Sequence, residues 1–297
     1  MAIDKHVENL FGSDVLTYFK NKQRGGANNQ KGAKYENLFA VMQLADLFYL
    51  LANENAEDIE IHTQAAAFVD DLVILDSHHN SQRHFQLKNK TTVTWGAAIK
   101  SICDDFHKQK LLNDDISIEN TKTYLVCSNQ TNAQTLKQSI PDSISNFSDV
   151  IFFPEAQTIN QLILIYPEFK IALERICFSN ESDKLEALAT ILLGHWANQK
   201  TTEFSGKKLL SGLENIFPNY LAKAATVAGL MPQVKNIFST ITHFEYKIEN
   251  GYFSWNYANL DSGFIPYPVD SHTFIEFQRK VIAKHPNQFS ELEGILL

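Results

Sequence analysis

Two apolar segments flank a polar loop in the stretch FVDDLVILDSHHNSQRHFQLK, which covers residues 68–88. Phe68–Leu75 and His84–Leu87 are rich in the branched and aromatic residues that favour β-strands. The eight residues between them, 76–83, are polar and predict a connecting loop. We therefore expect an antiparallel pair of strands in this stretch.

Helices and further strands surround this pair in an alternating order. Apolar residues recur at helical spacing over residues 1–22, 33–51, 95–110 and 133–139. Residues 59–63 and 123–127 have the composition of strands, and residues 23–32, rich in Gly and Asn, predict a mobile loop. This order predicts a layered α/β fold in which helices flank a mixed sheet.

The sequence changes in character after residue 150. Helical periodicity dominates residues 155–240, with helices expected over 185–196, 205–217 and 218–229, and a last helix over 271–284. Phe244–Ile248 and Tyr252–Tyr257 flank Asn250-Gly251, a strong signal for a β-hairpin. We expect an N-terminal domain over residues 1–150 and a mainly helical second domain over 151–297, serving oligomerisation or partner docking.

Composition narrows the class of protein. The chain has 297 residues, 44% of them hydrophobic, and a formal net charge of −8. An acidic chain of this kind is not a histone-like polyanion-coating protein, although local nucleic-acid binding is still compatible with it. Three widely separated cysteines, an N-terminus unlike a signal peptide and the lack of a long apolar run predict a soluble cytoplasmic protein that does not enter a membrane.

The side chains with the strongest chemical signal lie on the expected pair of strands. If Leu75 faces His84, the numbers of paired residues sum to 159, and Asp71 lies opposite Lys88. Side chains alternate between the faces of a strand, so Gln86 and Lys88 share a face with Asp71, whereas Asp70 does not. This register brings together a carboxylate, an amide oxygen and an ammonium group.

Such a group suits metal-assisted hydrolysis of a phosphodiester bond. Mg²⁺ or Mn²⁺ prefers oxygen ligands, which Asp71, Gln86 and the carbonyl of Leu87 can supply, with Asp70 as an alternative to Asp71. Glu36, on the preceding helix, is expected to hold the metal through water or to orient that water. Lys88 would oppose the charge that develops on the phosphate.

In these motifs the chain resembles the restriction-endonuclease-like PD-(D/E)xK superfamily of nucleases, which implies a restriction-endonuclease-like α/β fold with a mixed sheet flanked by helices. Gly32-Ala33-Lys34-Tyr35-Glu36 opens a helix, Asp71 precedes an apolar strand, Gln86-Leu87-Lys88 ends the next, and Leu125-Val126-Cys127-Ser128-Asn129 follows a helix. The Gln-x-Lys form is similar to the Mrr-like branch and to the double-stranded DNA endonuclease domain of CD-NTase-associated effectors, also found in Lamassu-type antiphage systems. The resemblance implies that Glu36, Asp71, Gln86 and Lys88 form the active site of a metal-dependent DNA endonuclease in antiviral defence.

The charge pattern supports contact with nucleic acid near this site. Nine acids and no Lys or Arg lie between residues 35 and 76, and basic residues lie on both sides of this segment. An acidic centre between basic segments is what a metal site in a phosphate-binding cleft needs, although ordinary solvated faces give the same pattern. The residues expected to contact DNA are Lys20, Lys22, Arg24, Lys31, Lys34, Arg83 and Lys90.

Two other functions are compatible with the sequence. In the first, the chain is a catalytically inactive member of the nuclease fold that binds DNA or acts as a scaffold subunit of a defence complex. Alternatively, the C-terminal region alone carries the function, as an interaction module. The resemblance also implies a regulatory partner subunit, such as an ATPase or nucleotide sensor, and a homo-oligomer is expected.

Overall fold

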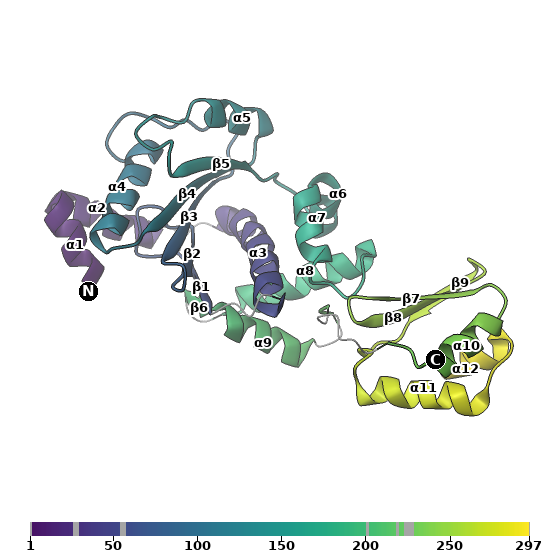
Figure 1. Cartoon of the computed structure of the whole chain (residues 1–297). Coiled ribbons are helices and arrows are strands. Elements are labelled where there is room, and N and C mark those ends of the chain that lie inside the picture. Colours follow the sequence, from purple (N-terminus) through teal and green to yellow (C-terminus); the bar gives the residue numbers. More distant parts are fainter. Residues whose placement is uncertain are drawn as a thin grey trace. The chain divides into compact units, whose positions relative to one another are not determined.

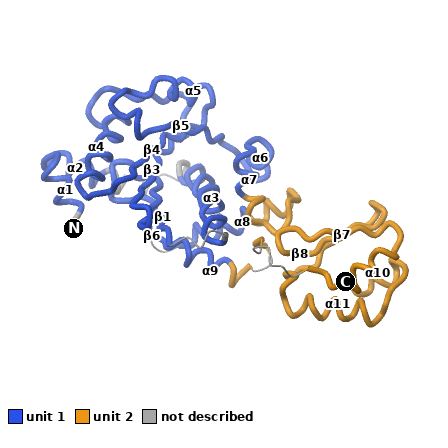
Figure 2. Tube along the Cα trace, in the orientation of Figure 1, with its two compact units in different colours: residues 1–172, 189–213 blue, residues 173–188, 214–297 orange. Residues whose placement is uncertain are grey.

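The computed structural model describes residues 2–25, 30–53, 58–199, 202–217, 220–222 and 229–296. The chain forms two compact units (Figure 2), one comprising residues 1–172 and 189–213 and the other residues 173–188 and 214–297. The first unit contains a six-stranded mixed sheet, and the second contains a three-stranded antiparallel sheet. The prediction of a mixed α/β fold with helices around a mixed sheet is therefore confirmed. Within the described ranges, every helix is too short or too polar to cross a membrane.

The sheet of the first unit has the strand order β5-β4-β3-β2-β1-β6. Strands β1, β2 and β3 pair antiparallel, as does β6 with β1, whereas β3, β4 and β5 run parallel. The bounds are β1 Ile59–Thr63, β2 Leu72–Asp76, β3 Ser81–Lys88, β4 Asn120–Cys127, β5 Ser148–Phe152 and β6 Glu203–Ser205.

Helices cover both faces of this sheet (Figure 1). Helix α3 (Gln30–Asn53) packs on one face through Phe39, whose ring centroid lies 5.3 Å from that of Phe85 in β3. Helices α4 (Ile102–Asp115) and α5 (Gln130–Gln138) form a second core with β4, which includes Phe106, Leu125 and Leu136. This arrangement buries the central strands from both sides, as a mixed sheet requires.

The N-terminal segment forms two helices instead of the single helix expected over residues 1–22. Helix α1 (Ala2–Phe11) and helix α2 (Ser13–Gly25) meet at Gly12, whose φ of +84° is incompatible with a continuous helix. The helices extend into the predicted loop 23–32 from both sides, and residues 26–29 lie outside the described residues. Val7 and Phe19 pack against Phe68 and Leu112, so both helices contribute to the first unit.

The division between the units differs from the expected boundary at residue 150. That position lies inside β5, which pairs in parallel with β4. The Tyr35 hydroxyl donates to the carbonyl of Phe153 over 2.8 Å, and β6 extends the same sheet beyond β1. Residues 151–172 and 189–213 therefore belong with the N-terminal sheet. Helices α6 (Ile159–Ile165), α7 (Pro167–Glu174), α8 (Ser182–Ala197) and α9 (Gly206–Ile216) occupy this part of the chain.

The second unit packs helices against one face of an antiparallel sheet. Strands β7 (Phe244–Glu249) and β8 (Tyr252–Tyr257) form the predicted hairpin, and the unpredicted β9 (Asp261–Phe264) pairs with β8. Asn250 and Gly251 have φ values of 52° and 79°, as this tight turn requires. Helices α10 (Pro232–Thr240), α11 (His272–Lys284) and α12 (Phe289–Leu296) complete the unit.

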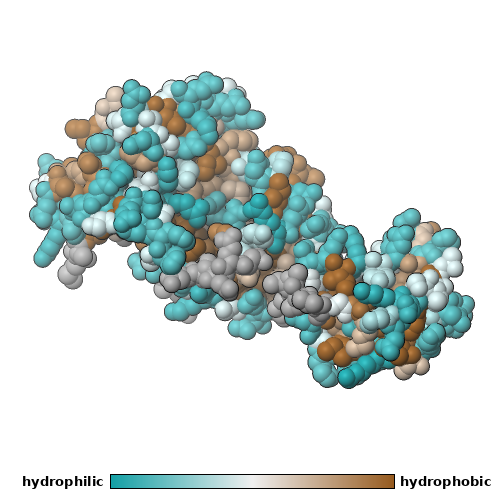
Figure 3. Space-filling model, in the orientation of Figure 1, coloured by the Kyte–Doolittle hydropathy of each residue, from teal (hydrophilic) through white to brown (hydrophobic). Residues whose placement is uncertain are grey.

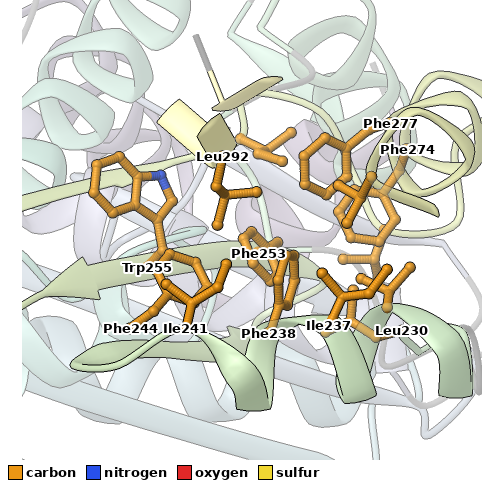
Figure 4. Close-up of a cluster of buried hydrophobic side chains, with 14 residues drawn as sticks. Leu230, Ile237, Phe238, Ile241, Phe244, Phe253, Trp255, Phe274, Phe277 and Leu292 are labelled. Atoms are coloured by element: carbon orange, nitrogen blue, oxygen red, sulfur yellow. The ribbon is translucent and has the colours of Figure 1, made fainter. Parts of the chain in front are cut away.

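The core of the second unit is aromatic (Figure 4). Phe253, at the centre of the sheet, contacts Phe238 of α10 and Phe274 and Phe277 of α11 at centroid distances of 5.7–5.9 Å. The helix expected over 218–229 falls mostly outside the described residues, and within them Leu221 forms a β-bridge with Cys177. The unit thus has its own hydrophobic core.

Hydrophilic residues predominate on the visible surface (Figure 3), with smaller apolar patches between them. The most exposed large apolar side chains of the described residues are Leu260, Ile99 and Leu164, at 88%, 77% and 71%. They lie in three separate segments of the chain. The apolar side chains in which the sequence is rich therefore lie mainly in the hydrophobic cores.

Candidate active site

The register of β2 and β3 differs by two residues from the expected one. Leu72 pairs with Phe85 and Val73 with His84, so paired numbers sum to 157 and not to 159. The polar residues 81–83 extend β3 because β4 supplies a parallel partner for them, which leaves a turn of only four residues, 77–80. A shift of two preserves the face on which each side chain lies. Continuing the ladder by one residue places Asp71 opposite Gln86, and Lys88 lies two residues beyond.

Asp71 is held by β3 through two hydrogen bonds to the same carboxylate oxygen. The side-chain amide of Gln86 and the backbone N–H of Leu87, at 2.7 Å, both donate to Asp71 Oδ2. Gln86 is almost completely buried, with 3% of its surface exposed. Leu87 thus contacts the site through its N–H group, whereas the sequence had suggested its carbonyl as a metal ligand. Both bonds limit the positions that the carboxylate can adopt.

Glu36, on α3, belongs to the same cluster of charges. Burial raises the pKa of its carboxyl to about 7, and the charges of Asp71 and Asp70 add to this shift while Lys88 opposes it. These effects require that Glu36 lies near all three groups. The carboxyl of Glu36 is thus partly buried and within reach of the charges of Asp71, Asp70 and Lys88, and its ionisation there is unfavourable unless a cation offsets the negative charge.

Asp70 lies beside Asp71 but in different surroundings. It is 3% exposed, and its charge acts on Tyr18 of α2 as well as on Glu36. The Tyr18 hydroxyl donates to the carboxylate of Asp105 in α4. Of the two adjacent acids, Asp71 is the one hydrogen-bonded to Gln86, so it is the better candidate for the reactive centre.

The cluster lies at the end of the sheet where β3 and β4 finish. Lys88, the last residue of β3, pairs with Cys127, the last residue of β4. The next residue along, Ser128, donates its N–H to the carbonyl of Lys88 over 3.3 Å, and Asn129 caps α5. In open α/β sheets, ligands bind outside the carboxyl ends of parallel strands. The candidate site occupies this position.

A buried polar network, which the sequence did not reveal, supports the segment that carries Asp71. Gln109 of α4 accepts hydrogen bonds from the N–H groups of Phe68 and Val69, at 2.8 and 3.3 Å. Its amide nitrogen donates to Asn113, which donates in turn to Thr121 of β4 and lies 3.2 Å from His84 of β3. Burial lowers the pKa of His84 to about 4, so this histidine is neutral near pH 7. In the sequence, the one signal for this network is the spacing of four residues between Gln109 and Asn113, which places both side chains on the same face of a helix.

The expected DNA-contacting residues are not all near this cluster. Arg83 lies five residues before Lys88 in β3, a separation of roughly 17 Å along a strand. Lys20 forms an ion pair with Asp4 over 3.3 Å. Arg83 and Lys20 are therefore the weaker candidates for contact with a ligand at the site.

Two other basic residues lie closer in the sequence to residues of the candidate site. Lys90 is exposed and follows Lys88 closely, and Lys34 precedes Glu36 on α3 and donates to the carbonyl of Gln157 over 2.5 Å. The side chains of Lys22, Arg24 and Lys31 lie outside the described residues. Lys90 and Lys34 are therefore the candidates that the described structure favours.

Few carboxylates at the candidate site are arranged to bind a metal ion. Across the described ranges, no group of three or more His, Cys, Asp or Glu side chains is arranged to hold a metal ion. Asp71 and Glu36 offer carboxylate oxygens, which fit Mg²⁺ or Mn²⁺ better than zinc, whereas Gln86 presents its amide nitrogen to Asp71. Comparison with protein-family models, curated proteins and solved structures gave no match. Function must therefore be argued from the site itself.

The raised pKa of Glu36 predicts a pH-dependent effect of Glu36→Gln on stability. Between 4.5 and about 7 the folded protein holds a proton on Glu36 that the unfolded chain releases, so the free energy of unfolding falls as pH rises through this window. We expect the variant to match the wild type near pH 4 and to be more stable, by roughly 1–2 kcal/mol, above pH 8. Thermal unfolding of both proteins across this range measures the difference. Parallel curves at all pH values would contradict a raised pKa.

Proposed function

We propose that this protein is a metal-dependent endonuclease that hydrolyses phosphodiester bonds of double-stranded DNA, as the effector nuclease of a prokaryotic antiphage defence system. One observation carries the proposal. Glu36 from α3, Asp71 before β2, and Gln86 and Lys88 from β3 form one cluster at the carboxyl end of parallel strands. These are the residues on which the resemblance to PD-(D/E)xK nucleases of the Gln-x-Lys form rests, and they come from three separate segments.

Each residue of the cluster has a role in this proposal. Lys88 would oppose the negative charge that grows on the phosphate oxygens during hydrolysis. Glu36 would accept the proton of the attacking water, because a base with a pKa near the working pH is efficient. Gln86 and the Leu87 N–H group orient the carboxylate of Asp71.

Mg²⁺ or Mn²⁺ would be held by Asp71 directly and by Glu36 through water. The amide oxygen of Gln86 would join them once the amide group turns over, since its nitrogen faces Asp71 in this structure. When bound, the ion lowers the pKa of water and offsets charge on the phosphate. The same cation would bring the pKa of Glu36 down from about 7, so that its carboxylate is ionised at neutral pH and can accept a proton from water.

One observation favours an inactive nuclease fold that binds DNA as the second candidate. Gln86 donates its amide nitrogen to Asp71, so the two side chains satisfy each other without a metal. The affinity of such a protein for DNA would fall as salt is added and would be the same with and without divalent cations.

Cleavage of supercoiled plasmid DNA by the purified chain tests the proposal. With Mg²⁺ or Mn²⁺ we expect nicked and linear products, which chelation of the metal abolishes. Asp71→Asn keeps the shape of the side chain and removes its charge, and we expect it to lower the rate by about 10²-fold or more. Asp149→Asn, an exposed aspartate of β5, is the matched control and should cut like the wild type.

Two results of this assay would decide between the candidates. Equal cutting by the wild type and Asp71→Asn would rule out the proposed site. DNA binding that is independent of metal, without cleavage even when the proposed regulatory partner subunit is added, would favour the inactive fold.

A further inference from the structure

A groove of about 780 Å³ lies on the sheet of the second unit. Phe253 and Trp255 of β8 belong to the hydrophobic core, so the alternating residues Ser254 and Asn256 lie on the opposite face of the strand. Both of these line the groove, together with residues 178–181 and Lys184. The face of the sheet that α10–α12 leave uncovered is therefore a hollow surface with a mixed polar and aromatic lining.

Aromatic rings form one part of the groove. The ring of Phe178 lies 4.9 Å from that of Phe264 and 5.4 Å from that of Tyr252, measured between centroids. Phe264 is 36% exposed, and the ammonium group of Lys184 lies 5.8 Å from the centre of its ring. The chain's own cation thus already occupies a position over this ring, which is the geometry of a cation–π interaction.

The charges around the groove are predominantly negative. Its lining includes three glutamates and two lysines. Lys184 pairs with Asp183 over 2.8 Å, and Lys247 pairs with Glu249 over 3.1 Å. Glu181 and Glu245 form no ion pair within the described part of the chain. Glu181 lies near enough to Lys184 to raise the pKa of its ammonium group as well. With Asp183, four carboxylates stand against two ammonium groups, and this negative surplus attracts a cation.

We propose that this groove binds a basic segment of a partner protein, with an arginine or lysine side chain seated on Phe264 and paired with Glu181 or Glu245. The negative surplus disfavours nucleic acid, because its phosphates would lie among carboxylates. The uncovered strand face offers Ser254 and Asn256 as hydrogen-bonding groups for an extended peptide. The inference concerns the second unit alone and does not depend on the nuclease site.

Fluorescence anisotropy with the full chain and a labelled peptide of alternating arginine and glycine tests this proposal. We expect saturable binding that weakens with added salt. Glu181→Gln combined with Glu245→Gln should weaken binding by about tenfold or more, and Phe264→Leu by about fivefold. Glu293→Gln, an exposed glutamate of α12 outside the groove, is the matched control and should bind within about twofold of the wild type.

Lys184→Met gives the most discriminating result, because it removes the competing cation from the Phe264 ring. We expect it to strengthen peptide binding by about threefold, whereas an acidic ligand would bind more weakly. A labelled oligothymidylate serves as the second probe. Failure of the peptide to bind at millimolar concentration, equal affinities across all variants, or oligothymidylate binding that Phe264→Leu abolishes would each overturn the proposal. Circular dichroism of every variant verifies that it is folded.

Discussion

Lys88→Met is expected to lower the rate of DNA cleavage by about 10²–10³-fold while leaving the protein folded. The ammonium group lies at the end of β3, near enough to Glu36 to lower the pKa of that carboxyl. In the proposed reaction it stabilises charge that is present only in the transition state, so its loss reduces the catalytic rate constant. DNA affinity should change by less than about threefold, because nonspecific binding is shared among many phosphate contacts.

The same variant should also change the pH profile of the residual activity. Lys88 lowers the pKa of Glu36, so its removal allows that pKa to rise above about 7. If ionised Glu36 is the base, the residual activity moves to higher pH. Lys122→Met, which removes an exposed ammonium group of β4 opposite Arg83 and far from Lys88 along the sheet, is the control and should retain most of the rate. A Lys88→Met protein that cuts within about threefold of the wild type would remove Lys88 from the reaction.

Gln109→Leu is expected to destabilise the first unit by about 2–4 kcal/mol. The side chain is 2% exposed, and its oxygen accepts from the N–H groups of Phe68 and Val69. Leucine has a similar size but cannot accept these bonds, and it also leaves Asn113 without its donor from Gln109. Thermal unfolding followed by far-UV circular dichroism measures the loss.

This prediction also connects stability with the candidate site. Phe68 and Val69 lie three and two residues before Asp71, so a disturbed segment 68–71 should misplace the carboxylate. At a temperature where Gln109→Leu is still folded, we expect slower cleavage than in the wild type with similar DNA affinity. Gln134→Leu, at an exposed position of α5, is the control and should change stability by less than about 0.5 kcal/mol. Similar melting curves for the two variants would show that the buried network contributes little.

Local sequence patterns were sufficient for several elements of the fold. The helix expected over 33–51 corresponds to α3, and the strand expected over 59–63 corresponds to β1. The hairpin around Asn250-Gly251 has the expected turn, because few residues other than Asn and Gly tolerate its positive φ angles. Periodicity and turn chemistry are properties of neighbouring residues, so they are readable without the fold.

Elements that depend on partners far away in the sequence could not be predicted from local patterns. β5 and β6 are short, and they are strands because β4 and β1 supply their hydrogen-bonding partners. The register error of two residues has the same origin, since polar residues 81–83 joined β3 by pairing with β4. A polar segment beside a turn has no local signal that separates loop from strand.

The candidate site also combines features that the sequence predicts with features that only the folded chain defines. The sequence by itself determined which residue types are available, Glu36, Asp71, Gln86 and Lys88, and the alternation of strands determined that the last three share a face. Only the tertiary structure decided that Asp71 lies opposite Gln86, that burial and neighbouring carboxylates raise the pKa of Glu36, and that Gln109 supports the segment before Asp71. The physical reason is that hydrogen bonding, burial and electrostatic interactions depend on distances in space, which residues far apart in the chain acquire only when it folds.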